Sequence, residues 1–207
     1  MTQSRGRLTG RRMLASVVAA ALAFALAACT NDATKIADTY KQGTNQGFVS
    51  GDGRVQEIAP ADRGEPIEFT GTAVDGSTVT SADYAGEVLV LNFWYAGCGP
   101  CRGEAPILEE THAETKDAGA SFLGVNIYDG PEQATSFEET YGITYPSLLA
   151  RKDAALKLAF ASWVSLSSVP YTLVLDRDGR VAARFVGAVL DDTSLPTIVK
   201  DVLAESS

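Results

Sequence analysis

The chain has 207 residues, of which 45% are hydrophobic and 21% are charged, a globular composition rather than a disordered or collagen-like one. Its formal net charge of -9 argues against nucleic-acid binding, because phosphates would repel it. Three cysteines are too few for a disulfide-rich scaffold, and the single histidine, His112, excludes a metal site built from several histidines.

The first 28 residues have the features of an export signal. Residues 1–12 contain four arginines and no acidic residue, and Met13–Ala28 is an almost entirely apolar run, shorter than the ~20 residues of a membrane-spanning helix. The run ends in Leu26-Ala27-Ala28-Cys29, which resembles the lipobox of bacterial lipoproteins. We expect residues 1–28 to be removed and Cys29 to receive lipid. The alternative is a buried cysteine that closes a hydrophobic helix.

The next segment predicts a tether followed by one domain. Residues 30–53 are rich in Asn, Asp, Thr, Gly and Lys, so 29–53 is expected to be flexible. Without residues 1–28, four of the 17 basic residues are lost, and 13 basic residues face 26 acidic ones. Such an acidic protein is not attracted to an anionic membrane, so the lipid on Cys29 would supply the anchor. The domain is expected to span 54–207.

Short strands are expected at the start of this domain, over Arg54–Ile58, Pro66–Thr70 and Ser77–Thr80. Asp75-Gly76 between the last two is a strong hairpin signal. Val88–Tyr95 is an apolar and aromatic run, typical of a strand buried on both faces.

Helices and strands then alternate. Helices are expected over Cys98–Lys116, Pro131–Tyr141, Asp153–Ala161 and Asp191–Ala204, and strands over Ser121–Tyr128, Tyr171–Asp176 and Arg180–Val186. Parallel strands joined by helices, followed by an antiparallel pair, predict an α/β fold with a mixed central sheet covered on both faces.

The motif that carries chemistry is Cys98-Gly99-Pro100-Cys101, where a buried strand gives way to a helix. Free N–H groups and the positive end of the helix dipole stabilise a thiolate there. We expect Cys98 to be the nucleophile. Cys101, one turn later, is close enough to form a disulfide with it and to resolve a mixed disulfide.

Two other roles for these cysteines are weaker. A structural zinc needs four nitrogen or sulfur ligands, and Cys98, Cys101 and His112 do not suffice without carboxylates. A disulfide across two residues removes little chain entropy, so it stabilises a fold poorly. Redox chemistry is preferred, and no metal or cofactor is expected.

The segment N-F-W-Y-A-G-C-G-P-C-R-G-E-A-P, residues 92–106, resembles the thioredoxin superfamily and is most similar to the exported TlpA/ResA-type disulfide reductases. The resemblance covers about residues 60–205 and includes Tyr141–Pro146, Ser168–Thr172 and Asp176–Arg180. It implies a thioredoxin-like three-layer α/β/α fold with a mixed central sheet and an N-terminal β-hairpin.

The resemblance also implies roles for single residues. Pro170 is expected to follow a cis bond, with the backbone of Val169 facing an extended substrate chain; an ordinary edge proline is the alternative. Glu104 is expected to lie partly buried below the cysteines and to handle their protons, rather than being a solvated helix acid. Asn92 stands where cytoplasmic thioredoxins carry a buried aspartate, which makes Glu104 the substitute.

One position departs from the family pattern. The residue before the first cysteine is usually tryptophan, and here it is Gly97, although Trp94 and Tyr95 remain nearby. We expect the missing indole to open the surface beside Cys98, and substrate to contact Trp94, Gly97 and Val169. This departure puts in doubt any transfer of the family's substrate preferences.

The expected function is thiol–disulfide exchange by a lipid-anchored protein on the outer face of the cytoplasmic membrane. Its implied partners are exported proteins with cysteine pairs, in similar proteins often an apocytochrome c, and a membrane thiol that donates electrons. The alternatives are oxidation of the same clients, and a redox-inactive or metal-binding lipoprotein that uses the fold for recognition.

Overall fold

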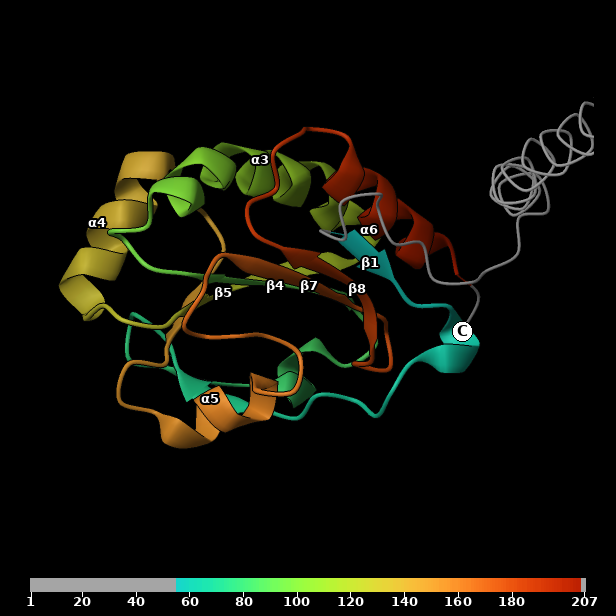
Figure 1. The fold of residues 1–207 in the computed structure, drawn as a ribbon, viewed down its shortest axis with the longest axis horizontal. Helices are drawn as coiled ribbons and strands as arrows, with labels where there is room; N and C mark the ends of the chain where they lie inside the picture. The colour runs from blue at the N-terminus through green and yellow to red at the C-terminus, as the bar shows by residue number, and fades with distance from the viewer. Residues whose placement is uncertain (1–54, 206–207) are drawn as a thin grey trace, which may run out of the picture. The chain divides into compact units, whose positions relative to one another are not determined.

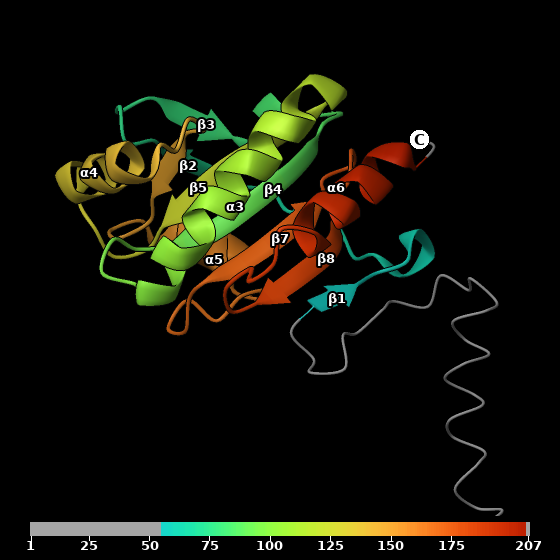
Figure 2. The ribbon, with the colours of Figure 1, turned by 90° about the horizontal axis from the view of Figure 1, so that it is seen from above.

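The computed structural model describes residues 55–205, and the predicted signal peptide, Cys29 and the tether lie outside this range. A six-stranded sheet in the order β1-β8-β7-β4-β5-β6 forms the middle layer (Figures 1 and 2). Its strands are β1 (Val55–Glu57), β4 (Val88–Trp94), β5 (Ala120–Asn126), β6 (Ser147–Leu149), β7 (Tyr171–Leu175) and β8 (Val181–Val186). A separate hairpin comprises β2 (Thr70–Thr72) and β3 (Thr78–Thr80).

The sheet is mixed, as predicted. Strand β4 pairs in parallel with β5, and β5 with β6, while β7 runs antiparallel to both β4 and β8. Strand β1 forms an antiparallel edge on β8. The carboxyl ends of β4 and β5 therefore meet at one edge of the sheet, where the chain enters the cysteine motif.

Helices cover both faces of the sheet (Figure 1). Helices α3 (Gly99–Thr115) and α6 (Ser194–Ala204) lie side by side on one face, and α5 (Ala154–Phe160) lies on the other with the β2–β3 hairpin (Figures 1 and 2). Helix α4 (Pro131–Tyr141) packs beside α3. Single 3-10 turns span Pro60–Asp62, Ser81–Tyr84 and Lys116–Ala118. The thioredoxin-like three-layer fold is thus confirmed.

The alternation of side chains along β4 explains why both faces need a cover. Leu91 and Phe93 point to the face that carries α5, where the ring of Phe93 meets Phe160 edge-on at 5.0 Å between centroids. Val88 and Val90 point to the opposite face, against α3 and α6. Each fully buried side chain of this size contributes roughly 1.5–3 kcal/mol.

The structure differs from the predicted elements in two places. The hairpin turns at Asp75-Gly76 as expected, with Gly76 at φ 87, but its first strand begins at Thr70 rather than Pro66. Ile67 and Phe69 alternate inward like strand residues, yet their N–H groups donate to the Gly179 carbonyl and the Ser81 hydroxyl, outside any ladder. The three-residue strand β6 was not predicted.

A buried ionic cluster ties the start of the described chain to its end. Arg63, with its side chain 3% exposed, contacts the carboxylate of Asp176 at 2.9 Å and that of Glu205 at 2.6 Å. Arg180 also pairs with Asp176, at 3.0 Å. The cluster lies beyond the end of β7, away from the cysteine motif that follows β4.

Candidate active site

The two cysteines lie at the first turn of α3, directly after β4. Cys98 is the N-cap residue of the helix, and its sulfur accepts a hydrogen bond of 3.1 Å from the backbone N–H of Cys101. The sulfurs are bonded at 2.03 Å, with 5.3 Å between the Cα atoms, which confirms the predicted pairing. A helix N-terminus that already donates to the Cys98 sulfur would stabilise a thiolate there after reduction.

Burial does not separate the two cysteines in this disulfide form. Cys98 is 3% exposed and Cys101 is 2% exposed. Gly97, Gly99 and Pro100 around them are exposed, and the two glycines have no side chain to cover the sulfurs. The N-cap position, rather than greater exposure, is therefore the structural feature that favours Cys98 over Cys101 as the predicted nucleophile.

Two polar side chains that sequence reasoning missed hold the loop before Cys98. The carboxylate of Asp129 accepts a 2.6 Å hydrogen bond from the Ala96 N–H, and the guanidinium of Arg102 donates to the Ala96 carbonyl at 2.7 and 2.9 Å. Asn126 in turn donates to Asp129 at 2.8 Å. Asp129 follows β5 at the edge where β4 also ends, and that position was the available signal.

Glu104 lies one helical turn after Cys101 and is only 1% exposed, so the alternative of a solvated helix acid is wrong. Its carboxylate accepts hydrogen bonds of 2.9 Å from the Asn92 side-chain amide and 2.9 Å from the Val189 N–H. Burial raises the pKa of Glu104 to about 7, and these two hydrogen bonds oppose the rise. A carboxyl with this pKa can accept and return a proton at neutral pH.

The loop before β7 faces the cysteines. The Val169–Pro170 peptide bond is cis, as expected. The side chain of Val169 is partly buried against the cluster that contains both cysteines, and the carbonyl of Pro170 accepts a 3.0 Å hydrogen bond from the Gly187 N–H. Pro170 and Val169 are thus brought to the cysteine motif although they lie about 70 residues away in the sequence.

The structure separates the roles predicted for Trp94 and Gly97. Trp94 is 4% exposed, and its indole packs on Phe137 at 4.3 Å between centroids, which speaks against direct contact with substrate. Gly97 is exposed, but a Cβ built there would lie 3.1 Å from the ring of Tyr95. Tyr95 therefore borders the surface that the glycine leaves open. Tyr128, which is 49% exposed, packs edge-on against the ring of Tyr95 at 5.2 Å between centroids.

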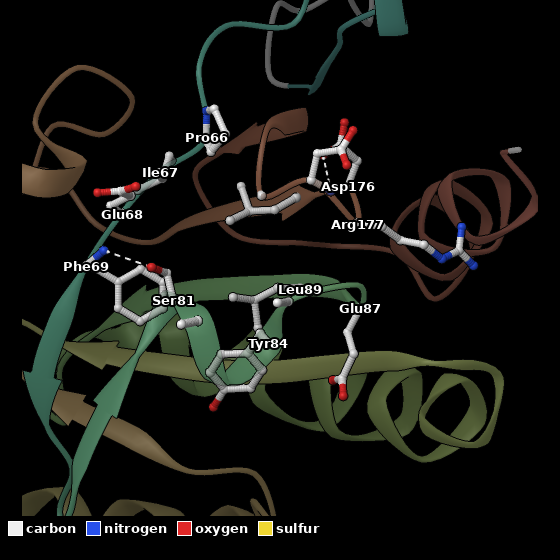
Figure 3. A pocket seen from close by; sticks show the side chains of 15 residues that line it. Pro66, Ile67, Glu68, Phe69, Ser81, Tyr84, Glu87, Leu89, Asp176 and Arg177 are labelled. Atoms are coloured by element: carbon white, nitrogen blue, oxygen red, sulfur yellow. Dashed lines mark hydrogen bonds between the residues drawn. The ribbon is translucent and has the colours of Figure 1, made fainter. Parts of the chain in front are cut away.

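A pocket lies at the end of the sheet where β4 begins and β7 ends (Figure 3). It has a volume of about 370 Å³, and Phe69, Leu89 and Leu175 line it together with the charged side chains of Glu87 and Arg177. Leu89 is near the start of β4, so this pocket is remote from the cysteines, which follow the end of that strand.

No helix within residues 55–205 is both long and apolar enough to cross a membrane. The same part of the chain brings no three His, Cys, Asp or Glu side chains together in a group that could hold a metal ion.

A dithiol that closes across the first turn of a helix can exchange its disulfide with that of another molecule. Together with the fold, this chemistry defines the class of thioredoxin-like thiol–disulfide oxidoreductases. Residues 55–202 match the Redoxin family model, and the chain belongs to the Redoxin family.

Relatives of the chain carry names of the same class. The chain is 35% identical over 135 residues to the thiol:disulfide interchange protein HelX of Rhodobacter capsulatus, covering 65% of this chain and 69% of that protein. It is 29% identical over 122 residues to the thiol-disulfide oxidoreductase ResA of Geobacillus kaustophilus, covering 59% of this chain and 67% of that protein. The protein is accordingly a thiol–disulfide oxidoreductase of the TlpA/ResA type.

Solved structures agree with this assignment. A secreted thiol-disulfide isomerase from Corynebacterium glutamicum superposes with a TM-score of 0.66 at 29% identity, covering 76% of this chain and 97% of that one. A DsbF homologue from Corynebacterium diphtheriae gives a TM-score of 0.64 at 31% identity, covering 77% and 99%.

Proposed function

We propose that the protein reduces disulfides of exported proteins while a lipid on Cys29 holds it at the outer face of the cytoplasmic membrane. The observation that carries the reducing direction is the buried carboxyl of Glu104, one turn beyond Cys101. A strongly oxidising dithiol stabilises its reduced thiolate form. An ionised carboxylate in the same low-dielectric interior does the opposite, because it repels a thiolate and so favours the disulfide form of the protein.

The proposed exchange has two steps. The Cys98 thiolate attacks one sulfur of a client disulfide, and the other client sulfur leaves as a thiolate that takes up a proton. Cys101 then loses its proton with the help of Glu104 and attacks Cys98. The second client thiol is released, and the disulfide of the present structure re-forms. A membrane thiol partner would return two electrons to this disulfide.

The proposed clients are exported proteins with a cysteine pair, such as an apocytochrome c. The resemblance to TlpA/ResA-type proteins supports this client class. Gly97, Gly99 and Pro100 beside Cys98 are exposed and carry no long side chains. A substrate as large as a protein chain could therefore approach Cys98, which supports the same client class.

Reductase activity can be tested with insulin and dithiothreitol, and direction with the reduction potential. We expect the protein to accelerate insulin reduction. We also expect its reduction potential to be closer to that of thioredoxin, about -270 mV, than to that of DsbA, about -120 mV. A potential near that of DsbA would favour the oxidase alternative, and no acceleration would favour a binding protein. The Cys101→Ser variant is expected to retain clients as mixed disulfides, which identifies them.

Anchoring needs a separate test. Intact-mass analysis of the membrane-extracted protein is expected to show a lipid-modified N-terminal Cys29. The Cys29→Ala variant is expected to leave the membrane fraction while the domain stays folded. An unmodified N-terminus, or cleavage elsewhere, would contradict the lipoprotein assignment without touching the redox chemistry.

A further inference from the structure

A small interior cavity adjoins Cys101, and the reaction described above gives it no role. Four residues with polar side-chain groups line it together with the cysteine: Asn92, Trp94, Tyr145 and Ser147. The other lining residues are apolar. It offers about 10 Å³ to the centre of a water molecule, which is close to the least that one buried water needs.

Ser147, on strand β6, gives this cavity an unsatisfied polar group. The residue is 2% exposed, and its hydroxyl oxygen has no protein partner at hydrogen-bonding geometry. A buried hydroxyl without a partner is costly, whereas a water molecule in the adjoining space would satisfy it. Gly124, its neighbour on β5, has no side chain, and a Cβ built there would overlap the Ser147 hydroxyl.

On its other side, Ser147 lies close to Glu138 of helix α4. Burial raises the pKa of Glu138, and the nearby Ser147 hydroxyl partly offsets the rise, although the pair falls short of full hydrogen-bond geometry. Glu138 is only partly buried, so it borders solvent as well as the interior. The other titratable groups near this region are Tyr145 and, from α3, Glu104, Glu109 and His112, whose ring packs against that of Tyr145 at 5.5 Å between centroids.

We propose that the cavity holds one water molecule which, with Ser147 and Glu138, carries the proton of Cys101 to solvent. In the second step of exchange the Cys101 S–H bond breaks, and its proton passes to the water and through the Ser147 hydroxyl to the Glu138 carboxylate. The electron pair left on sulfur forms the bond to Cys98, and the client thiolate leaves. The path supplements Glu104 and serves exchange in either direction.

Ellman's disulfide separates the two steps of the reaction. Attack by Cys98 on this reagent releases one thionitrobenzoate, and attack by Cys101 on the mixed disulfide releases the second. We expect Ser147→Ala and Glu138→Gln each to slow the second release about three- to tenfold at pH 7. This loss is less than the ~100-fold of a direct general base because Glu104 remains. The first release is expected to be unchanged.

Glu139→Gln is the matched control, since Glu139 is the next residue of α4, carries the same charge and is exposed. It is expected to leave both phases unchanged. If the second phase of Ser147→Ala or Glu138→Gln equals that of this control, the relay is wrong. If the wild-type protein shows no two-phase release, the cysteine chemistry itself is wrong, which is a different failure.

Stability tests separately whether the cavity beside Ser147 holds a water molecule. A hydroxyl bonded to a buried water stabilises the fold, so Ser147→Ala is expected to lower the urea midpoint of the oxidised protein. A hydroxyl with no partner destabilises the fold, so its removal would raise the midpoint. A raised midpoint would therefore overturn the proposed water site.

Discussion

The side-chain amide of Asn92 donates a 2.9 Å hydrogen bond to the carboxylate of Glu104, and neither residue is more than 4% exposed. This pair joins the central strand β4 to the helix that carries both cysteines. The amide favours the ionised carboxylate, while burial favours the neutral acid, and burial is the larger effect. The balance leaves a carboxyl that titrates near neutral pH beside a redox-active pair.

The free energy of unfolding of the oxidised protein is expected to depend on pH because of Glu104. Folding raises its pKa from 4.5 to about 7, so between these pH values the folded state holds more protons than the unfolded state. The contribution of Glu104 to the free energy of unfolding therefore decreases as pH rises through that window, by roughly 3 kcal/mol in total. Urea unfolding at pH 5, 6, 7 and 8 measures the fall as the difference between wild type and Glu104→Gln.

The exposed Glu110, on the same helix, provides the control for this measurement. Glu110→Gln is expected to keep the pH dependence of the wild type, and Glu104→Gln to flatten it even where the lost hydrogen bond lowers its absolute stability. Parallel curves for wild type and Glu104→Gln would mean that Glu104 titrates as an ordinary surface acid.

Removing Asn92 is expected to raise the pKa of Glu104 further. The Asn92→Ala variant loses a hydrogen bond that favours the carboxylate, while Glu104 stays buried. Carbon-13 NMR titration of the Glu104 carboxyl in the oxidised protein measures this change. Thr172→Val is the control, because the Thr172 hydroxyl accepts from Asn92 at 3.1 Å without contacting Glu104. A pKa that falls in Asn92→Ala would mean that water entering the vacated space outweighs the lost bond.

Alkylation of the reduced protein is expected to modify Cys98 before Cys101. The sulfur of Cys98 accepts the N–H of Cys101 at the start of α3, which favours its thiolate, and the residues beside it are exposed. Peptide mapping after brief iodoacetamide treatment is expected to show a difference on the order of tenfold. Cys98→Ser is expected to abolish insulin reduction. Faster labelling of Cys101 would reverse the assignment of the nucleophile.

Changes to Arg63 in the ionic cluster are expected to lower the stability of the protein without affecting catalysis. Arg63→Ala removes the partner that Asp176 and Glu205 share, and breaking a fully buried pair costs about 3–5 kcal/mol. The loss is expected to be smaller here, because Arg180 still pairs with Asp176 and the Glu205 side chain is one-third exposed. Arg63→Lys is expected to restore only part of this, since one ammonium cannot reproduce contacts made by two guanidinium nitrogens. Urea unfolding measures both variants.

The exposed Arg151 is the control for charge alone, and Arg151→Ala is expected to be neutral. Insulin reduction by folded Arg63→Ala is expected to match wild type, because Asp176 and the cis-proline loop lie at opposite ends of β7. A folded variant with impaired reduction would mean that the cluster also shapes the active site.

The order of elements and the place of the cysteines could be predicted because their signals are local. The apolar run that forms β4 is buried on both faces, and a proline just inside the helix start marks the beginning of α3. Asp153 caps α5 by accepting the N–H of Leu156, and Gly76 makes the hairpin turn. Each signal acts within a few residues, so the sequence carries it without knowledge of the fold.

The surroundings of the disulfide depended on distant contacts. A glutamate one turn after Cys101 could face solvent or the interior, and only the packing of α3 over Asn92 and of Val189, 85 residues away, buries it. The three residues of β6 form a strand because β5 and Ala73 pair with them, and this places Ser147 at the cavity beside Cys101. The sequence by itself determined where the reactive sulfurs lie along the chain. The tertiary structure decided which protonatable groups surround them, because burial and hydrogen-bond partners come from segments remote in sequence.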